Sequence, residues 1–120
     1  IWAEELARAG AGPDPRPESV RRYGAVDTPE KCERLLARAG FCRREVRTVR
    51  FERRWEPGEL TRVRRSCGPT GRRLASLPAP ERRRCVVRAA RHTARLSPEE
   101  LVWRPAVVHA VGRVDPRGAP

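Results

Sequence analysis

The side chains best suited to chemistry in this sequence are four cysteines and two histidines. The cysteines are separated by 10, 25 and 18 positions and stand at Cys32, Cys42, Cys67 and Cys85. Structural zinc sites draw on close ligand pairs such as C-x-x-C, and no such pair occurs here. An even number of cysteines permits disulfides, but no secretory signal indicates an oxidising compartment. We therefore predict free, mostly buried thiols, no metal, and a cytoplasmic protein.

Neither histidine has a catalytic partner at a recognisable spacing. His92 lies in an arginine-rich helical segment, where it is either a general base or a solvated surface side chain. His109 lies among valine and alanine residues, as a histidine packed in a sheet would. Cys67, in a Gly/Pro loop, could be a reactive thiol, but no histidine is near it in sequence. No Ser/His/Asp arrangement, metal-ligand cluster or carboxylate pair stands out, so the catalytic residues stay unknown.

Arginine dominates the charge of the 120-residue chain, whose net charge is +12. Of its 27 basic residues, 26 are arginine, and 17 of these lie in residues 41–100 against seven glutamates. Such a balance is typical of phosphate binders and allows a small Arg-rich nucleic-acid-binding module. A GC-rich genome is the other explanation, since Ala, Gly and Pro are abundant as well. The aromatic side chains near the arginines that could stack on bases are few: Tyr23, Phe51 and Trp55.

Helical periodicity is clearest between residues 28 and 40. Thr28 and Pro29 are a typical N-cap and first helical residue, and Gly40 follows the last turn as a C-terminal stop. Between them an apolar stripe has helical spacing: Cys32, Leu35, Leu36 and Ala39. Further helices are predicted at 2–9 and 80–95, with one or two turns at 59–66. Ser97 and Glu100 form a capping box that opens a short turn.

Two segments favour β-structure. Residues 45–53 interleave β-formers with arginine, and Pro57-Gly58 follows their end. Residues 106–114 are almost continuously apolar, which predicts a strand buried on both faces. We interpret 9–20 as a Pro/Gly loop, 23–26 as extended and "CGPTG" (67–71) as a break.

Two strands are too few for a stable sheet. We therefore expect a chain cut from something longer, with weak stability and self-association through unpaired strand edges.

The order of these segments suggests a family. "DTPE" (27–30), "LLARAGF" (35–41), a V-x-x-V-x-F strand and a final "VVHAVGRV" strand together resemble the C-terminal part of a class I S-adenosylmethionine-dependent methyltransferase, within its broad small-molecule group. The resemblance implies an α/β fold: the end of a Rossmann-like seven-stranded sheet, with an antiparallel terminal strand pair and covering helices. It spans residues 1–114, and residues 115–120 are expected to be a disordered tail.

The cofactor implied by this resemblance is S-adenosyl-L-methionine, which the family holds with a glycine-rich E/D-x-G-x-G-x-G loop after a strand. The chain has no such loop, because its glycine pairs at 10/12 and 68/71 lie in other contexts. We expect the cofactor to be bound by a missing N-terminal half, and the chain alone to be inactive. A truncated product or interaction fragment would look the same.

The resemblance leaves acceptor binding to this part of the protein. The candidates for the wall of a pocket that takes a small-molecule methyl acceptor are Phe51, Trp55 and Trp103, for which packing in a core or interface is the alternative. Salt dependence separates this hypothesis from the nucleic-acid module, whose binding would weaken steeply as salt is added. No apolar run approaches the roughly 18 residues of a membrane span, so no membrane partner is expected.

Overall fold

The computed structural model describes residues 1–116, apart from the side chains of residues 19 and 20. These residues form a mixed α/β structure of two compact units. The helical unit comprises Ile1–Pro17 and Arg53–Trp103, and the sheet unit comprises Glu18–Glu52 and the segment that begins at Arg104. Most of the tail predicted at 115–120 lies outside the described residues.

The sheet unit contains the helix that the sequence marks most clearly. Helix α3 (Pro29–Arg38) begins where expected, because the Thr28 hydroxyl accepts a hydrogen bond from the Lys31 N–H at 3.2 Å. The helix ends before Gly40, whose φ of +87° is the left-handed conformation that glycine adopts without strain. The predicted cap, helix and stop are confirmed. Of the predicted apolar stripe, Cys32 is buried and Leu36 half-buried, whereas Leu35 and Ala39 are exposed.

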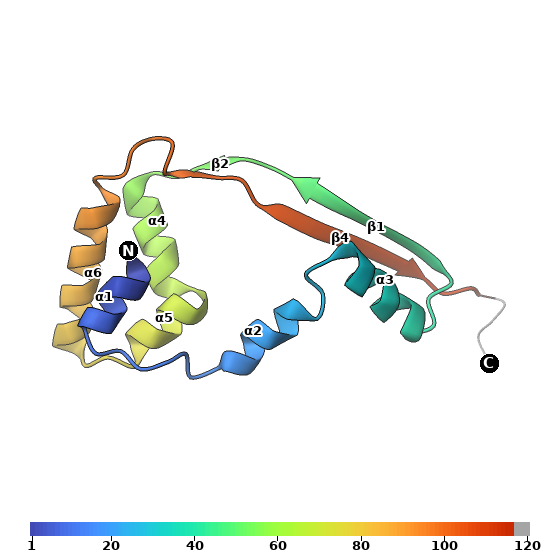
Figure 1. The fold of residues 1–120 in the computed structure, drawn as a ribbon, viewed down its shortest axis with the longest axis horizontal. Coiled ribbons are helices and arrows are strands. Elements are labelled where there is room, and N and C mark those ends of the chain that lie inside the picture. The colour runs from blue at the N-terminus through green and yellow to red at the C-terminus, as the bar shows by residue number, and fades with distance from the viewer. Residues whose placement is uncertain (117–120) are drawn as a thin grey trace. The chain divides into compact units, whose positions relative to one another are not determined.

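Strand β1 (Arg43–Arg50) pairs antiparallel with β4 (Ala106–Arg113), in register from Arg43 opposite Arg113 to Arg50 opposite Ala106 (Figure 1). This confirms an antiparallel strand pair. The first strand is shorter at its C-terminal end than predicted, because Pro105 has no N–H to donate to the ladder. Pairing resumes beyond it in β2 (Arg53–Arg54) and β3 (Val102–Trp103), which belong to the helical unit.

The β1–β4 pair is covered on one face. Helix α3 packs on both strands, and a Cβ atom added to Gly112 would lie 2.7 Å from the Phe41 ring. On the other face Val49, Val107 and Val111 are exposed. The prediction that β4 is buried on both faces is therefore wrong for the described residues. It fails because β1 is its only strand partner among them, and no described element covers this face.

Helix α2 (Pro17–Gly24) lies in a region that we predicted as a loop followed by an extended approach. Both predictions are wrong at these positions. Pro17 fits the first turn of a helix, and Glu18 suits the positive end of the helix dipole. Proline in this segment therefore starts a helix instead of preventing one.

The helical unit contains α1 (Trp2–Arg8), α4 (Pro57–Ser66), α5 (Gly68–Ala75) and α6 (Ala79–Thr93) (Figure 1). The predicted break at 67–71 is wrong beyond its first residues. Cys67 is extended and Gly68 has a φ of +61°, so the chain turns sharply there and at once enters α5. A core of four side chains joins α1, α5 and α6: Leu6, Leu74, Leu77 and Cys85.

A buried carboxylate fastens α1 to α6. Glu5 is 1% exposed, and its Oε2 accepts a hydrogen bond from Arg88 Nε at 2.5 Å. Its Oε1 accepts one from Arg8 at 3.3 Å and lies 4.0 Å from His92 Nε2. The hydrogen bond from Arg88, with the charges of Arg8 and Arg88, lowers the pKa of Glu5 although burial raises it. Glu5 is therefore ionised within the fold.

The substitution Glu5→Gln tests this contact. The amide keeps the size of the side chain but removes the charge that Arg88 faces, and we expect the free energy of unfolding to fall by about 2 kcal/mol. Urea unfolding at pH 7 measures the change. Glu4→Gln, at a neighbouring carboxylate that is 78% exposed, is the matched control and should stay within about 0.5 kcal/mol of the wild type. Equal losses in the two variants would contradict the contact.

A second ion pair fixes the loop after α1 to α5. Arg72 donates from Nε and Nη2 to the two carboxylate oxygens of Asp14, both at 2.7 Å. This bidentate hydrogen bonding lowers the pKa of Asp14 from 3.8 to about 2. Since the folded-state pKa lies below the ordinary value, the pair contributes its full stabilisation above about pH 4 and loses it as the pH falls toward 2.

A double-mutant cycle with Asp14→Asn and Arg72→Gln should show this pH dependence. We expect the coupling free energy between the two side chains to stay near its full value from pH 7 to about pH 4 and to fall to a small part of it at about pH 2, where half of the Asp14 carboxyls are protonated in the folded chain. Urea unfolding at several pH values measures it. A coupling as large at pH 2 as at pH 7, or one that is absent at pH 7, would rule out the pair as described.

Candidate functional site

The indoles of Trp55 and Trp103 lie side by side, with ring centroids 6.3 Å apart and planes tilted by 30°. Backbone pairing places them there. Arg53 and Arg54 pair with Trp103 and Val102, and the Trp55 N–H donates to the Leu101 carbonyl at 3.0 Å. The capping box that precedes β3 is also present, since Ser97 and Glu100 exchange hydrogen bonds at 2.8 and 3.3 Å. The short strand pair therefore gives the two rings a fixed separation.

These rings form one wall of a cavity of about 210 Å³ in the helical unit. The end of α4 and the start of α5 supply the other walls, chiefly through Leu60, Val63, Cys67 and Pro69. Pockets for drug-sized ligands usually exceed about 300 Å³, so this cavity suits a smaller molecule or one ring of a larger one. Its lining favours a flat apolar or aromatic group.

The guanidinium group of Arg53 lies over the face of the Trp55 ring. Its guanidinium carbon lies 4.1 Å from the centroid of that ring, and its Nη2 donates to Glu59 Oε1 at 2.5 Å. A cation over an indole face contributes about 0.5–1 kcal/mol at a partly exposed position. Sequence reasoning missed Arg53 and Glu59. The available signal was the spacing of two between Arg53 and Trp55, which places both side chains on one side of an extended segment.

Phe51, the third residue predicted to line an acceptor pocket, lies in the sheet unit. Its N–H donates to the Pro105 carbonyl at 3.3 Å, and its side chain is exposed. The structure thus brings Trp55 and Trp103 together in the helical unit, and Phe51 is not among the residues that line their cavity. An acceptor-binding role stays a prediction for all three.

The four cysteines are free, which confirms that part of the prediction. Only two of them, Cys32 and Cys85, are buried, so the expectation of mostly buried thiols holds for half of them. Burial raises the pKa of the Cys85 thiol. Cys67 is exposed and lines the cavity beside the indoles. His92 contacts Glu5 instead of a thiol.

The described residues offer no site for a metal or for the cofactor of the family. Among them, no three His, Cys, Asp or Glu side chains gather as metal ligands would. In the methyltransferase family that the sequence resembles, the glycine-rich loop that holds the cofactor follows a strand. Among the described residues, Gly10 follows α1 and Gly68 follows α4, so neither glycine lies in such a loop. These residues therefore do not fit S-adenosylmethionine.

No protein-family model, curated protein or solved structure matches the chain. Within the part of the chain that the structure describes, no helix has the length and apolar character needed to cross a membrane. The function is therefore inferred from the residues and contacts given above.

Thiol reactivity tests the environment of Cys67. We expect Ellman's reagent to modify Cys42 and Cys67 rapidly in the folded chain, and Cys32 and Cys85 only after unfolding, because the latter two are buried. Cys67→Ser should remove half of the fast phase. Four thiols that react at a single rate would contradict this arrangement.

Proposed function

We propose that this chain is the substrate-side part of an S-adenosylmethionine-dependent methyltransferase that acts on a small-molecule acceptor. The observation that carries the proposal is the β1–β4 pair, which runs antiparallel over eight residues and is joined through helices instead of a tight turn. In the family that the sequence resembles, a helix, a strand, covering helices and a final antiparallel strand follow in this order. The observed order α3, β1, α4 to α6, β4 matches it.

The uncovered face of the strand pair supports the same proposal. Val49, Val107 and Val111 would be covered in a larger sheet that has helices on both faces. The free edge of β4 would then pair with a further strand, since β1 occupies its other edge. An isolated two-stranded sheet is marginal in water, so this pair is expected to be the end of a larger one.

Within this proposal the helical unit binds the acceptor. Transfer of a methyl group is an in-line displacement, for which a protein mainly positions the reactants and excludes water. Trp55 and Trp103 would contact the flat part of the acceptor, while Arg53 and Glu59 fix the ring of Trp55. Since the described residues do not fit the cofactor, their part is confined to binding and orienting the acceptor.

The reading frame upstream of the Ile1 codon gives the decisive test. We expect it to encode a strand followed by E/D-x-G-x-G-x-G. The protein from the whole frame should bind S-adenosylmethionine in titration calorimetry, and the 120-residue chain alone should give no binding heat. A frame without that loop, or steeply salt-dependent binding of nucleic acid by the whole protein, would overturn the proposal.

The acceptor pocket is tested in the same whole protein. With methyl-labelled cofactor and a panel of small aromatic alcohols and amines, Trp55→Ala should lower the transfer rate about tenfold or more and leave cofactor affinity unchanged. Tyr23→Ala removes an exposed aromatic ring of the sheet unit and is the matched control. Equal effects of the two substitutions would remove the pocket from the proposal while leaving the cofactor result intact.

A further inference from the structure

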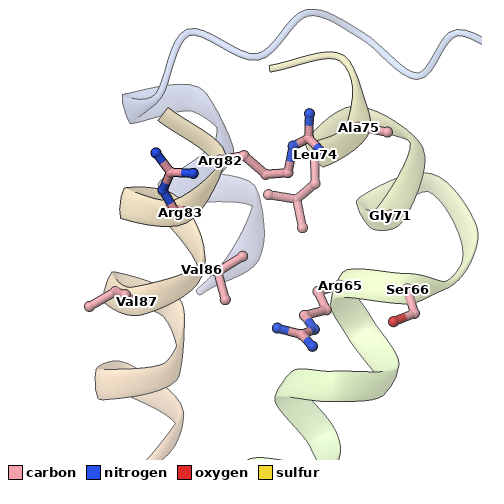
Figure 2. Close-up of a pocket in the computed structure, with 9 residues that line it drawn as sticks. All are labelled: Arg65, Ser66, Gly71, Leu74, Ala75, Arg82, Arg83, Val86 and Val87. Atoms are coloured by element: carbon pink, nitrogen blue, oxygen red, sulfur yellow. The ribbon is translucent and has the colours of Figure 1, made fainter. Parts of the chain in front are cut away.

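The helical unit contains a second cavity, of about 490 Å³, between the end of α4, the helix α5 and the first half of α6 (Figure 2). It shares no lining residue with the cavity beside Trp55 and Trp103. Its volume is within the range of pockets that take small organic ligands.

Apolar side chains form the inner part of this cavity. Leu74 is 2% exposed, and Figure 2 shows it directed from α5 into the space that Val86 enters from α6. Gly71 allows α5 to lie close to α4, because a Cβ atom added there would be 3.0 Å from the backbone carbon of Ser66. The inner surface of this cavity is therefore apolar.

Three arginines line the cavity as well, with no acidic residue among its lining side chains: Arg65 on α4, and Arg82 and Arg83 on α6. Arg82 is oriented by a hydrogen bond from its Nη2 to the Leu77 carbonyl at 3.1 Å. Arg65 and Arg83 have no hydrogen-bond or ion-pair partner anywhere in residues 1–116.

Four other arginines of this unit each face a carboxylate of the chain, whereas Arg62 and Arg91 have no such partner among residues 1–116. The four are Arg53 with Glu59, Arg72 with Asp14, Arg84 with Glu81 and Arg88 with Glu5. Arg65 and Arg83 lack a carboxylate partner among residues 1–116, and both line a cavity with an apolar interior. That combination matches an amphipathic anion and not a neutral apolar molecule.

We propose that this cavity binds a small organic anion, an apolar body that carries a carboxylate or phosphate group. The planar guanidinium pairs with either group through two parallel hydrogen bonds, and Leu74 and Val86 contact the body. This proposal goes beyond methyl transfer and does not depend on it, because the ligand is bound by the helical unit alone.

The test uses the 120-residue chain in titration calorimetry with octanoate, octyl phosphate and octanol. We expect saturable binding of at least one of the two anions at one site, and binding about tenfold weaker or more for octanol, which has the same apolar chain without the charge. The double variant Arg65→Gln/Arg83→Gln should weaken binding of the anion by about tenfold or more and leave that of octanol unchanged.

The matched control is Arg62→Gln/Arg91→Gln, which removes the same charge from exposed positions on the same two helices outside the cavity. It should leave the affinity within about twofold. Val87→Trp, at an exposed position on the cavity edge, should block the anions without unfolding the chain, as circular dichroism would show. Absence of saturable binding, octanol bound as tightly as the anions, or equal losses in the two double variants would each overturn the proposal.

Discussion

The ion pair between Glu5 and Arg88 holds the helical unit in one arrangement. Helix α1 has seven residues and would not persist in isolation, since isolated helices shorter than roughly 12 residues are marginal. Its place is decided by two adjacent residues: Leu6 enters the apolar core, while Glu5 must meet a cation because a buried, unpaired carboxylate costs several kcal/mol. The observed position of α1 along α6 meets both demands. That position covers Cys85 and Leu74, and so supports the helices that form both cavities.

Helix α4 lines both cavities of the helical unit, with different residues of the same turns. Arg64 lines the cavity beside Trp55 and Trp103, and Arg65 lines the cavity of about 490 Å³, because consecutive side chains on a helix are about 100° apart. The sharp turn at Cys67 and Gly68 then directs α5 so that its first residues belong to one cavity and Leu74 to the other. A single helix-turn-helix segment thereby separates a cavity lined by two indoles and one arginine from a cavity lined by three arginines. The composition, with its net charge of +12, could not have shown this, since it counts paired and unpaired arginines alike.

Features decided by neighbouring residues could be predicted from the sequence. The start and stop of α3 and the capping box at Ser97 each depend on contacts within a few positions. The two strands were also found, because their β-formers are dense. The sequence misled where glycine and proline start helices, as at Pro17 and Gly68. It was silent on contacts between distant residues: Glu5 and Arg88 are 83 positions apart, and Trp55 meets Trp103 only through the pairing of β2 with β3. The two indoles of the candidate site could therefore be predicted from the sequence, but the Arg53–Glu59 pair beside them could not.

Strand β4 is covered on one face and open on the other. Its apolar run predicted burial on both faces, yet α3 covers only the face of Val46 and Val108, and the other face is open. Covering the three exposed valines of the pair would gain roughly 1 kcal/mol each or more, and pairing the free edge would satisfy further N–H and C=O groups. A sequence selected for an exposed face would alternate polar residues with apolar ones. β4 does not alternate in this way, so its composition fits a strand with neighbours on its second edge and second face.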